Sequence, residues 1–234
     1  MLLAIDVGNT RIKSAVFEGN TLIDLFGFEP ENATENFKNI FMQYPKIAHL
    51  VVSSVGKTVD FDFSKLSKSI SVHFISNEDH FPFQNKYGTP QTVGIDRLTL
   101  AAGATLLFPN TNRLVIDAGT CVTYDFIDAQ NKYWGGAISP GLRLRYESLH
   151  QFTAKLPLLT KENPLHFIGN TTNQSIHSGV VIGLIYEIEG FIEQYQLENE
   201  NFTIILTGGD AEFLAKRLKN TIFANSNFLL ESLN

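Results

Sequence analysis

The chain has 234 residues, a formal net charge of −6 and a single cysteine, and 44% of its residues are hydrophobic. This length allows two modest domains or one large one. The acidic balance, without any basic run, argues against nucleic acid as the main partner, and one cysteine excludes an internal disulfide. No stretch approaches the uninterrupted apolar length of a membrane span, and the first strand begins without a signal-peptide pattern. We therefore expect a cytoplasmic protein without a membrane partner.

Residues 2–17, LLAIDVGNTRIKSAVF, predict a strand, a tight turn and a second strand. An apolar run ends at Asp6, the chain turns through Gly8, Asn9 and Thr10, and an alternating run follows. Short apolar runs separated by glycine and asparagine are typical of a β-hairpin.

The segments that follow predict a third strand, a helix and two further strands. We place them at residues 21–28, 32–43, 47–55 and 72–76, respectively. The near-continuous apolar run at 47–55 is typical of a strand that is covered on both faces. Residues 57–69 are weakly patterned and predict no element. This order of elements is the opening of a ribonuclease-H-like domain.

A loop and a helix complete the first half of the chain. Residues 77–90 contain prolines and a glycine, which exclude regular structure through that stretch. Residues 94–108 are rich in alanine and leucine and predict a helix. The sequence Pro-Asn-Thr-Asn at 109–112 is the best candidate for a domain boundary, so we expect domains at 1–110 and 111–234.

The second half opens by repeating the first hairpin. At 113–127, RLVIDAGTCVTYDFI, the residues Asp117, Gly119 and Thr120 correspond to the aspartate, glycine and threonine of the first copy. Further strands are predicted at 133–138 and 202–206. Helices are predicted at 142–152, at 172–195 with three glycine interruptions, and at 211–219. Repetition of the hairpin suggests a duplicated fold that holds a ligand between its halves.

The repeated hairpin suits phosphate chemistry. A carboxylate at the end of a buried strand is costly unless a cation lies opposite it. Glycine lets backbone N–H groups approach an anion, and the hydroxyl groups of Thr10 and Thr120 can donate to phosphate oxygens. Since Asp6 repels phosphate directly, it is suited to Mg²⁺ or to the waters of that ion. One copy alone would favour an ordinary hairpin with an Asx turn, but two copies at matching places favour the phosphate site.

Asp96 lies in the first turn of the helix predicted at 94–108. There it has two interpretations from the residues alone. It is either an acid that stabilises the helix start or a base kept ionised by Arg97 and the helix N-terminus. Tyr87, in the preceding loop, either covers a small ligand or anchors the loop. The lone cysteine, Cys121, is expected to be a small buried side chain.

Four motifs occur in a characteristic order: DVGNT at 6–10, GIDR at 94–97, DAGT at 117–120 and GGD at 208–210. With them the chain resembles the type III pantothenate kinases, bacterial enzymes of the superfamily of acetate and sugar kinases, Hsc70 and actin. The resemblance covers essentially the whole chain. It implies an α/β fold of two ribonuclease-H-like, actin-like ATPase domains with mixed five-stranded sheets and an interdomain nucleotide cleft. It implies ATP-dependent phosphorylation of pantothenate to 4′-phosphopantothenate, the first step of coenzyme A biosynthesis.

The resemblance also implies residue roles. Asp96 would accept the proton of the pantothenate hydroxyl, Asp117 would help to bind a monovalent cation, K⁺ or NH₄⁺, and the family forms homodimers. Lys13 either reaches a phosphate or is only solvated, and Thr172 either lines the substrate pocket or caps its helix. The residues expected to bind ATP are Asp6, Val7, Gly8, Asn9, Thr10, Arg11, Ile12, Lys13 and Thr120. The residues expected to bind pantothenate are Tyr87, Gly94, Ile95, Asp96, Arg97 and Thr172.

Two other functions compete with this expectation. One is a sugar or acyl kinase of the same superfamily, which the GIDR segment and the tyrosine loop disfavour. The other is an ATP-binding regulator without enzymatic activity, which has no use for a base at Asp96. A P-loop kinase is excluded because no glycine-rich loop is followed by Lys-Ser or Lys-Thr.

Overall fold

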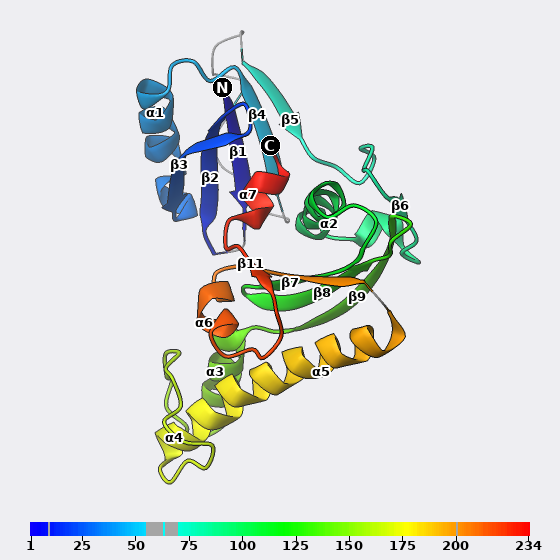
Figure 1. The fold of residues 1–234 in the computed structure, drawn as a ribbon. Coiled ribbons are helices and arrows are strands. Elements are labelled where there is room, and N and C mark those ends of the chain that lie inside the picture. The colour runs from blue at the N-terminus through cyan, green and yellow to red at the C-terminus, as the bar shows by residue number, and fades with distance from the viewer. Residues whose placement is uncertain (9, 55–62, 64–69, 200) are drawn as a thin grey trace. The chain divides into compact units, whose positions relative to one another are not determined.

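The computed structural model describes residues 1–8, 10–54, 63, 70–199 and 201–234. The chain forms two compact units (Figure 1). Unit 1 comprises Met1–Leu107 and Asn227–Asn234, and unit 2 comprises Phe108–Ser226.

Unit 1 is built on a mixed five-stranded sheet with the order β3-β2-β1-β4-β5. The opening hairpin is formed by β1 (Leu2–Val7) and β2 (Ile12–Glu18), and β3 (Thr21–Phe28) continues the antiparallel meander. The strands β4 (His49–Ser54) and β5 (Ser71–Phe74) add parallel pairings. The predicted mixed sheet of the first half is confirmed. Apart from Phe63, the weakly patterned stretch at 57–69 lies outside the described residues.

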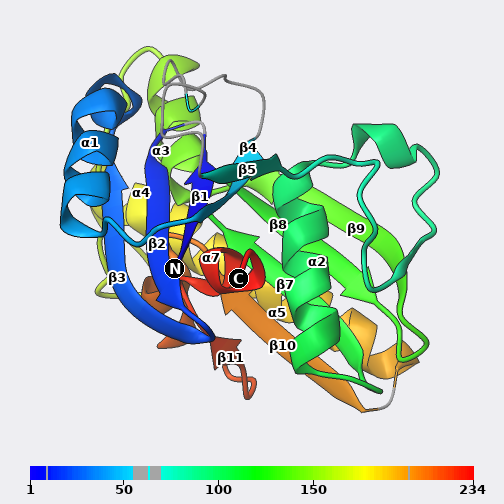
Figure 2. The same cartoon turned by 90° about the horizontal axis from the view of Figure 1, so that it is seen from above.

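Helices cover both faces of this sheet (Figure 2). On one face, α1 (Ala33–Gln43) packs Phe37 and Ile40 against alternate residues of β1 such as Ile5. On the other face lie α2 (Ile95–Leu107) and α7 (Phe228–Ser232). The period of two along β1 therefore buries the strand on both sides, because odd and even residues face different helices.

The segment before α2 contains a two-residue strand and a short helix. These are β6 (Gln84–Asn85) and the 3₁₀ helix η3 (Pro90–Thr92), and a similar 3₁₀ turn, η1 (Pro30–Asn32), precedes α1. The predicted absence of regular structure at 77–90 is therefore wrong at residues 84–85 and at Pro90.

Unit 2 repeats the strand order of unit 1. Its strands pair as β11-β10-β7-β8-β9, with β7 antiparallel to β8 and parallel to β10. Their bounds are β7 (Asn112–Ala118), β8 (Cys121–Ile127), β9 (Lys132–Pro140), β10 (Phe202–Thr207) and β11 (Phe223–Ala224). The helices are α3 (Leu142–Gln151), α4 (Thr172–His177), α5 (Gly183–Glu198) and α6 (Ala211–Ala215). The duplicated ribonuclease-H-like architecture is thus confirmed.

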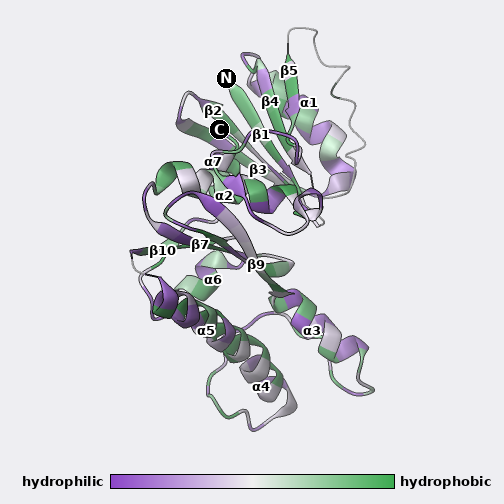
Figure 3. Ribbon diagram, turned by 90° about the vertical axis from the view of Figure 1, so that its right-hand side faces the viewer, coloured by the Kyte–Doolittle hydropathy of each residue, from purple (hydrophilic) through white to green (hydrophobic). Residues whose placement is uncertain are grey.

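The helix predicted at 172–195 is present as a composite. A π-helical turn at Ser178–Ile182 joins α4 to α5, and the helix continues to Glu198. Its buried residues, including Val181, Leu184 and Ile188, belong to the core of unit 2. Figure 3 shows hydrophilic and hydrophobic residues intermixed along α5.

The C-terminal end departs from the prediction. The helix predicted at 211–219 ends at Ala215, and no element is predicted beyond it, although β11 and α7 follow. The expected second domain, 111–234, includes residues 227–234, whereas these residues belong to unit 1. The reason is apolar burial, because Leu230 and Leu233 cover Ala4 and Ala15 on the sheet of unit 1. Gly103 of α2 allows close packing, since a Cβ there would lie 1.9 Å from the Ser232 hydroxyl oxygen.

Candidate active site

Asp6 stands at the end of β1 in unit 1, paired with Lys13 of β2 and Ser53 of β4. Burial, followed by the negative charge of Asp96, raises the pKa of its carboxyl group, and Lys13 partly offsets these two effects, so that the resulting pKa is about 7. Asp6 and Asp96 therefore interact electrostatically, although 90 residues separate them in sequence. Two carboxylates that repel each other are suited to share a cation.

The turn of the first hairpin is held by backbone contacts. The N–H of Gly8 donates to the carbonyl oxygen of Arg11 at 3.1 Å, and a Cβ at Gly8 would lie 3.0 Å from that oxygen. The side chains of Thr10 and Arg11 are exposed, whereas Val7 and Ile12 are buried. Only the backbone of the two buried residues can therefore contact a ligand. The predicted ATP ligand Asn9 lies outside the described residues.

Asp96 is held tightly at the start of α2. One carboxylate oxygen, Oδ1, accepts the backbone N–H of Arg97 at 2.8 Å. Because α2 begins at Ile95, the cap position falls on Gly94, and Asp96 is a residue of the first turn. A Cβ at Gly94 would lie 2.4 Å from the same carboxylate oxygen. The backbone therefore approaches the carboxylate so closely that only glycine leaves it in place.

Arg97 and Tyr87 lie side by side in unit 1. The guanidinium carbon of Arg97 lies 5.8 Å from the centroid of the Tyr87 ring, within the range of a cation–π contact. Arg97 is buried, and Tyr87 is half-buried. The backbone N–H of Tyr87 donates to the Asn85 side chain at 3.0 Å. The structure thus brings together the predicted substrate residues of the GIDR motif and the tyrosine loop.

Unit 2 carries the second hairpin turn. The N–H of Gly119 donates to the carbonyl oxygen of Cys121 at 2.9 Å, which corresponds to the bond from Gly8 to Arg11 in the first copy, although this turn is one residue shorter. Asp117 is half-buried at the end of β7, and Thr120 is exposed. Cys121 is also exposed, so the expectation that it is buried is wrong. Its position explains this, because it is the first residue after the turn and the first residue of β8.

Gly208 approaches this turn more closely than any side chain would allow. Its φ is +96°, and a Cβ would lie 2.4 Å from both the Ala118 carbonyl oxygen and the Asp117 carboxylate. The N–H of Asp210 donates to that same carbonyl oxygen at 2.9 Å. The GGD turn and the DAGT turn therefore form one cluster in unit 2.

We expect Gly208→Ala to destabilise the protein by at least about 2 kcal/mol, because it adds backbone strain and a clash with a carbonyl group. Gly209→Ala is the matched control, since a Cβ there has no neighbour within 4 Å. Urea unfolding measures both variants. Equal free energies of unfolding for the two would contradict the close approach.

A polar network fixes the strand end that adjoins the second turn. Arg145 donates to the Pro140 carbonyl oxygen and to the Ser139 hydroxyl, both at 2.8 Å, and its guanidinium pairs with Glu187. Burial alone would raise the pKa of Glu187, but hydrogen bonds from Arg145, Ser139 and Tyr124 outweigh it and lower the pKa. Gly141, which follows Pro140, donates its N–H to the Thr120 carbonyl oxygen at 3.0 Å. The network thus fixes the end of β9, whose next residue, Gly141, is hydrogen-bonded to the turn.

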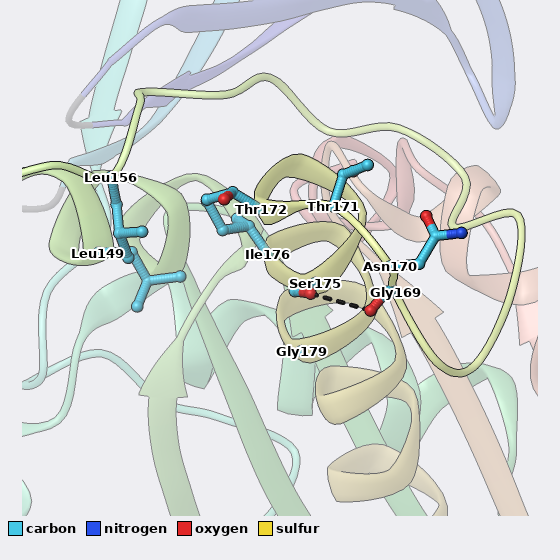
Figure 4. A pocket seen from close by; sticks show the side chains of 9 residues that line it. All are labelled: Leu149, Leu156, Gly169, Asn170, Thr171, Thr172, Ser175, Ile176 and Gly179. Atoms are coloured by element: carbon cyan, nitrogen blue, oxygen red, sulfur yellow. Dashed lines mark hydrogen bonds between the residues drawn. The ribbon is translucent and has the colours of Figure 1, made fainter.

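Thr172 belongs to unit 2, whereas the other predicted substrate residues belong to unit 1. The N-cap of α4 is Thr171, whose hydroxyl accepts the Gln174 N–H at 3.3 Å, so Thr172 is free of the capping role. It lines a pocket of about 720 Å³, a volume typical of small-molecule sites. Figure 4 shows its lining residues, Leu149, Leu156, Gly169, Asn170, Thr171, Thr172, Ser175, Ile176 and Gly179.

The residues that the structure describes contain no group of three or more His, Cys, Asp or Glu side chains placed to hold a metal ion. Single carboxylates do fit a cation that brings most of its ligands with it, as Mg²⁺ bound to nucleotide phosphates does. Asp117 in unit 2 is such a carboxylate, and Asp6 in unit 1 is another, with Asp96 as a carboxylate that acts on it electrostatically.

The family model for type III pantothenate kinase matches residues 2–194. The chain belongs to the type III pantothenate kinase family. It is 62% identical over 233 residues to the type III pantothenate kinase of Flavobacterium johnsoniae, a match that covers 100% of this chain and 96% of that protein. It is 63% identical over 234 residues to the type III pantothenate kinase of Flavobacterium psychrophilum, covering 100% and 97%.

Solved structures support the fold of this family member. A conserved protein of the Baf family of transcriptional activators from Campylobacter jejuni superposes with a TM-score of 0.62 at 20% identity, covering 99% of this chain and 94% of that one. A glucokinase from an Antarctic psychrotroph superposes with a TM-score of 0.51 at 11% identity, covering 99% and 97%. At these identities the likeness concerns the fold alone.

Proposed function

We propose that the protein phosphorylates pantothenate with ATP to form 4′-phosphopantothenate, the first step of coenzyme A biosynthesis. Membership of the family supports this reaction. One structural observation supports it most: the Asp96 carboxylate, fixed by Gly94 and the Arg97 N–H, faces the charge of Asp6 within unit 1. A phosphate-loop carboxylate and a fixed acid in electrostatic contact are what phosphoryl transfer to an alcohol requires.

Asp96 is the proposed general base. An alcohol attacks better as its proton leaves, so the acceptor must lie within hydrogen-bond reach of the hydroxyl group. The Arg97 N–H occupies one carboxylate oxygen and orients the other. Arg97 and Tyr87 are the proposed contacts to the polar groups of pantothenate, because a guanidinium suits a carboxylate. Gly94 and Ile95 supply backbone at the same helix start.

The proposed nucleotide contacts lie on both hairpins. In unit 1 they are Asp6 and the turn from Val7 to Lys13, and in unit 2 they are Thr120, with the Gly208-Gly209 turn near the adenosine. Asp6 would hold Mg²⁺, which neutralises phosphate charge when it is bound. The location of the nucleotide cleft stays a prediction.

Lys161 supports a role for the Gly208-Gly209 turn. Its ammonium group pairs with the Asp210 carboxylate and lies 5.5 Å from the centroid of the Phe213 ring. This pair joins the connector between α3 and α4 to the turn. Within the turn, a Cβ at Gly209 would have no neighbour within 4 Å. A flat base could lie against that backbone.

We propose that Asp117 helps to bind K⁺ or NH₄⁺. Its carboxylate lies among backbone carbonyl oxygens of the second turn, oxygen donors that suit such a cation. Asp117→Ala should reduce the stimulation of turnover by K⁺ over Na⁺ at least about tenfold, a loss of the size expected for one charge-assisted contact. ADP release in the two salts measures the effect, with Asp128→Ala, on the loop after β8, as the control. An unchanged response to K⁺ would refute the assignment.

We propose that the active form is a homodimer. Large exposed apolar side chains lie close in sequence to residues that line the pocket around Thr172, namely Phe152 (81% exposed), Ile168 (78%) and Phe167 (66%). Exposed apolar patches commonly mark protein interfaces. Gly179, which is exposed, and Gly183, which is half-buried, have open space where a Cβ would stand, so a second helix could approach closely there.

We propose a cytoplasmic enzyme without a membrane or nucleic-acid partner. The helix Thr172–Glu198 is long and apolar enough to cross a membrane, with a mean hydropathy of 1.3, and 39% of that window is buried. It is accounted for as a core helix, because Val181, Leu184 and Ile188 pack inside unit 2 and Glu187 pairs with Arg145. The net charge of −6 disfavours contact with nucleic acid.

The test of the proposed reaction is detection of its product. Purified protein, incubated with ATP, Mg²⁺ and pantothenate in potassium buffer, should yield phosphopantothenate by mass spectrometry. The reaction without enzyme is the control. Absence of the phosphorylated product with correctly folded protein would contradict the proposed function.

A further inference from the structure

The loop from Asn77 to Val93 carries Tyr87 and leads directly into Gly94 and Asp96, yet little regular structure supports it. Its ends are joined by one side chain. The amide nitrogen of Asn77 donates to the Pro90 carbonyl oxygen at 2.9 Å and to the Val93 carbonyl oxygen at 3.0 Å. Both amide protons of Asn77 are thereby used, and the two acceptors are the first residue of the 3₁₀ helix η3 and the residue that follows its last one.

Asn77 is itself anchored to the sheet of unit 1. The N–H of Ile75 donates to the carbonyl oxygen of Val52 in β4 at 2.9 Å. The chain then turns around Asp79, whose carboxylate accepts the Ser76 N–H at 2.9 Å and lies 3.0 Å from His73. Asn77 therefore projects from a turn that β4 holds in place.

The same strand is linked to the phosphate hairpin. The residue after Val52 is Ser53, the register partner of Asp6 on β1. A continuous chain of contacts thus runs from Asp6 through β4 and the turn at Asp79 to Asn77. From Asn77 it passes to Val93, which is followed directly by Gly94 at the start of α2.

We propose that Asn77 is a positioning residue that sets the start of α2, and with it Asp96 and Arg97, relative to the phosphate hairpin and Tyr87. The expected effect of Asn77 on turnover rests on the proposed function, whereas its effect on the backbone does not. Asn77 does not touch the proposed reacting groups and acts through the backbone at Pro90 and Val93.

The exposure of Asn77 makes its role separable from folding. The residue is exposed, so its replacement leaves no cavity, and exposed substitutions usually change stability little. The loss of its two hydrogen bonds should instead change the local position of the backbone at Pro90 and Val93. The loss of two neutral hydrogen bonds of this kind corresponds to a decrease in kcat/KM on the order of tenfold.

The kinetic test compares Asn77→Ala and Asn77→Asp with Asn36→Ala. Asn36 is the matched control, because its amide also donates to a backbone carbonyl oxygen, that of Asn32 at 2.8 Å, at the start of α1. We expect Asn77→Ala to lower kcat/KM for pantothenate about tenfold and to leave the KM for ATP unchanged. Asn77→Asp should be worse, since a carboxylate donates nothing and repels both carbonyl oxygens, although it matches asparagine in shape. The melting temperature of each variant should fall no further than that of the control.

Hydrogen exchange of the full-length protein tests the positioning role of Asn77 without relying on activity. In Asn77→Ala the amides of Thr92 and Leu98, which bond to Thr89 and Gly94, should exchange faster than in the wild type, whereas those of β1 should not. If these amides exchange faster in Asn77→Ala but the wild type does not phosphorylate pantothenate, the positioning role of Asn77 stands and the proposed function is rejected. Unchanged exchange, or an Asn77→Asp variant that behaves like the wild type, would overturn the inference.

Discussion

Asp96→Asn should lower kcat for pantothenate phosphorylation by about 10²–10⁴-fold, the range typical of losing a general base, and should leave ATP binding intact. The amide keeps the shape of the side chain and can still accept the Arg97 N–H through its oxygen. It cannot take the proton of the attacking hydroxyl group. Initial rates of ADP release and calorimetric titration with ATP measure the two properties.

The control for this variant is Asp24→Asn. Asp24 is a carboxylate of the same unit, on β3, and it accepts hydrogen bonds from Tyr44 and from the Leu25 N–H, which asparagine can also do. Its replacement should leave kcat unchanged. Near-normal turnover by Asp96→Asn would show that another group accepts the proton.

Asp6→Asn should abolish turnover while stabilising the ligand-free protein at neutral and higher pH. The folded-state pKa of Asp6, about 7, exceeds the ordinary value of 3.8 because burial and Asp96 disfavour the charged form. The native state therefore holds a proton that the unfolded chain releases. Between about pH 4 and pH 7 the free energy of unfolding falls as pH rises, by up to about 1.4 kcal/mol per pH unit, or about 4 kcal/mol in all.

Urea unfolding at pH 5 and pH 8 measures this difference. The wild type should lose stability between these two values, and Asp6→Asn should lose less, because an amide does not titrate. The gain of the variant over the wild type should therefore be greater at pH 8. Identical pH dependence of the two proteins would show that Asp6 is not held in the protonated form.

Much of the fold could be predicted from local patterns. The strand at 21–28 matches β3, and the apolar periodicity at 32–43 matches α1 to within one residue. The repeated hairpin could be recognised because aspartate, glycine and threonine recur in the same order, and in both copies the glycine N–H donates to the carbonyl oxygen of the residue after the threonine. Elements dictated by their own sequence are therefore well predicted.

What depends on distant contacts could not be predicted. The helix α7 has five residues, too few for a periodic signal, and it forms because Leu230 finds the sheet of unit 1. The exposure of Cys121 follows from its place at the hairpin turn and not from its residue type.

The candidate site shows the same division. The GIDR motif indicated Asp96 and Arg97, but nothing in the sequence marks Asn77, because an asparagine in a loop has many ordinary roles. Its partners, Pro90 and Val93, lie 13 and 16 residues away. Nor does sequence spacing predict that Asp6 and Asp96 interact, since only the packing of α2 beside β4 in unit 1 brings them together.

The measurement that tests the central claim most directly is ADP release by the purified protein with different acceptors. Pantothenate, glucose and N-acetylmannosamine would be compared at equal concentration with ATP and Mg²⁺ in potassium buffer. We predict release that depends on pantothenate and exceeds the background hydrolysis of ATP, with no stimulation by either sugar. Stimulation by a sugar, with none by pantothenate, would contradict the account and assign the protein to the sugar kinases that share its fold.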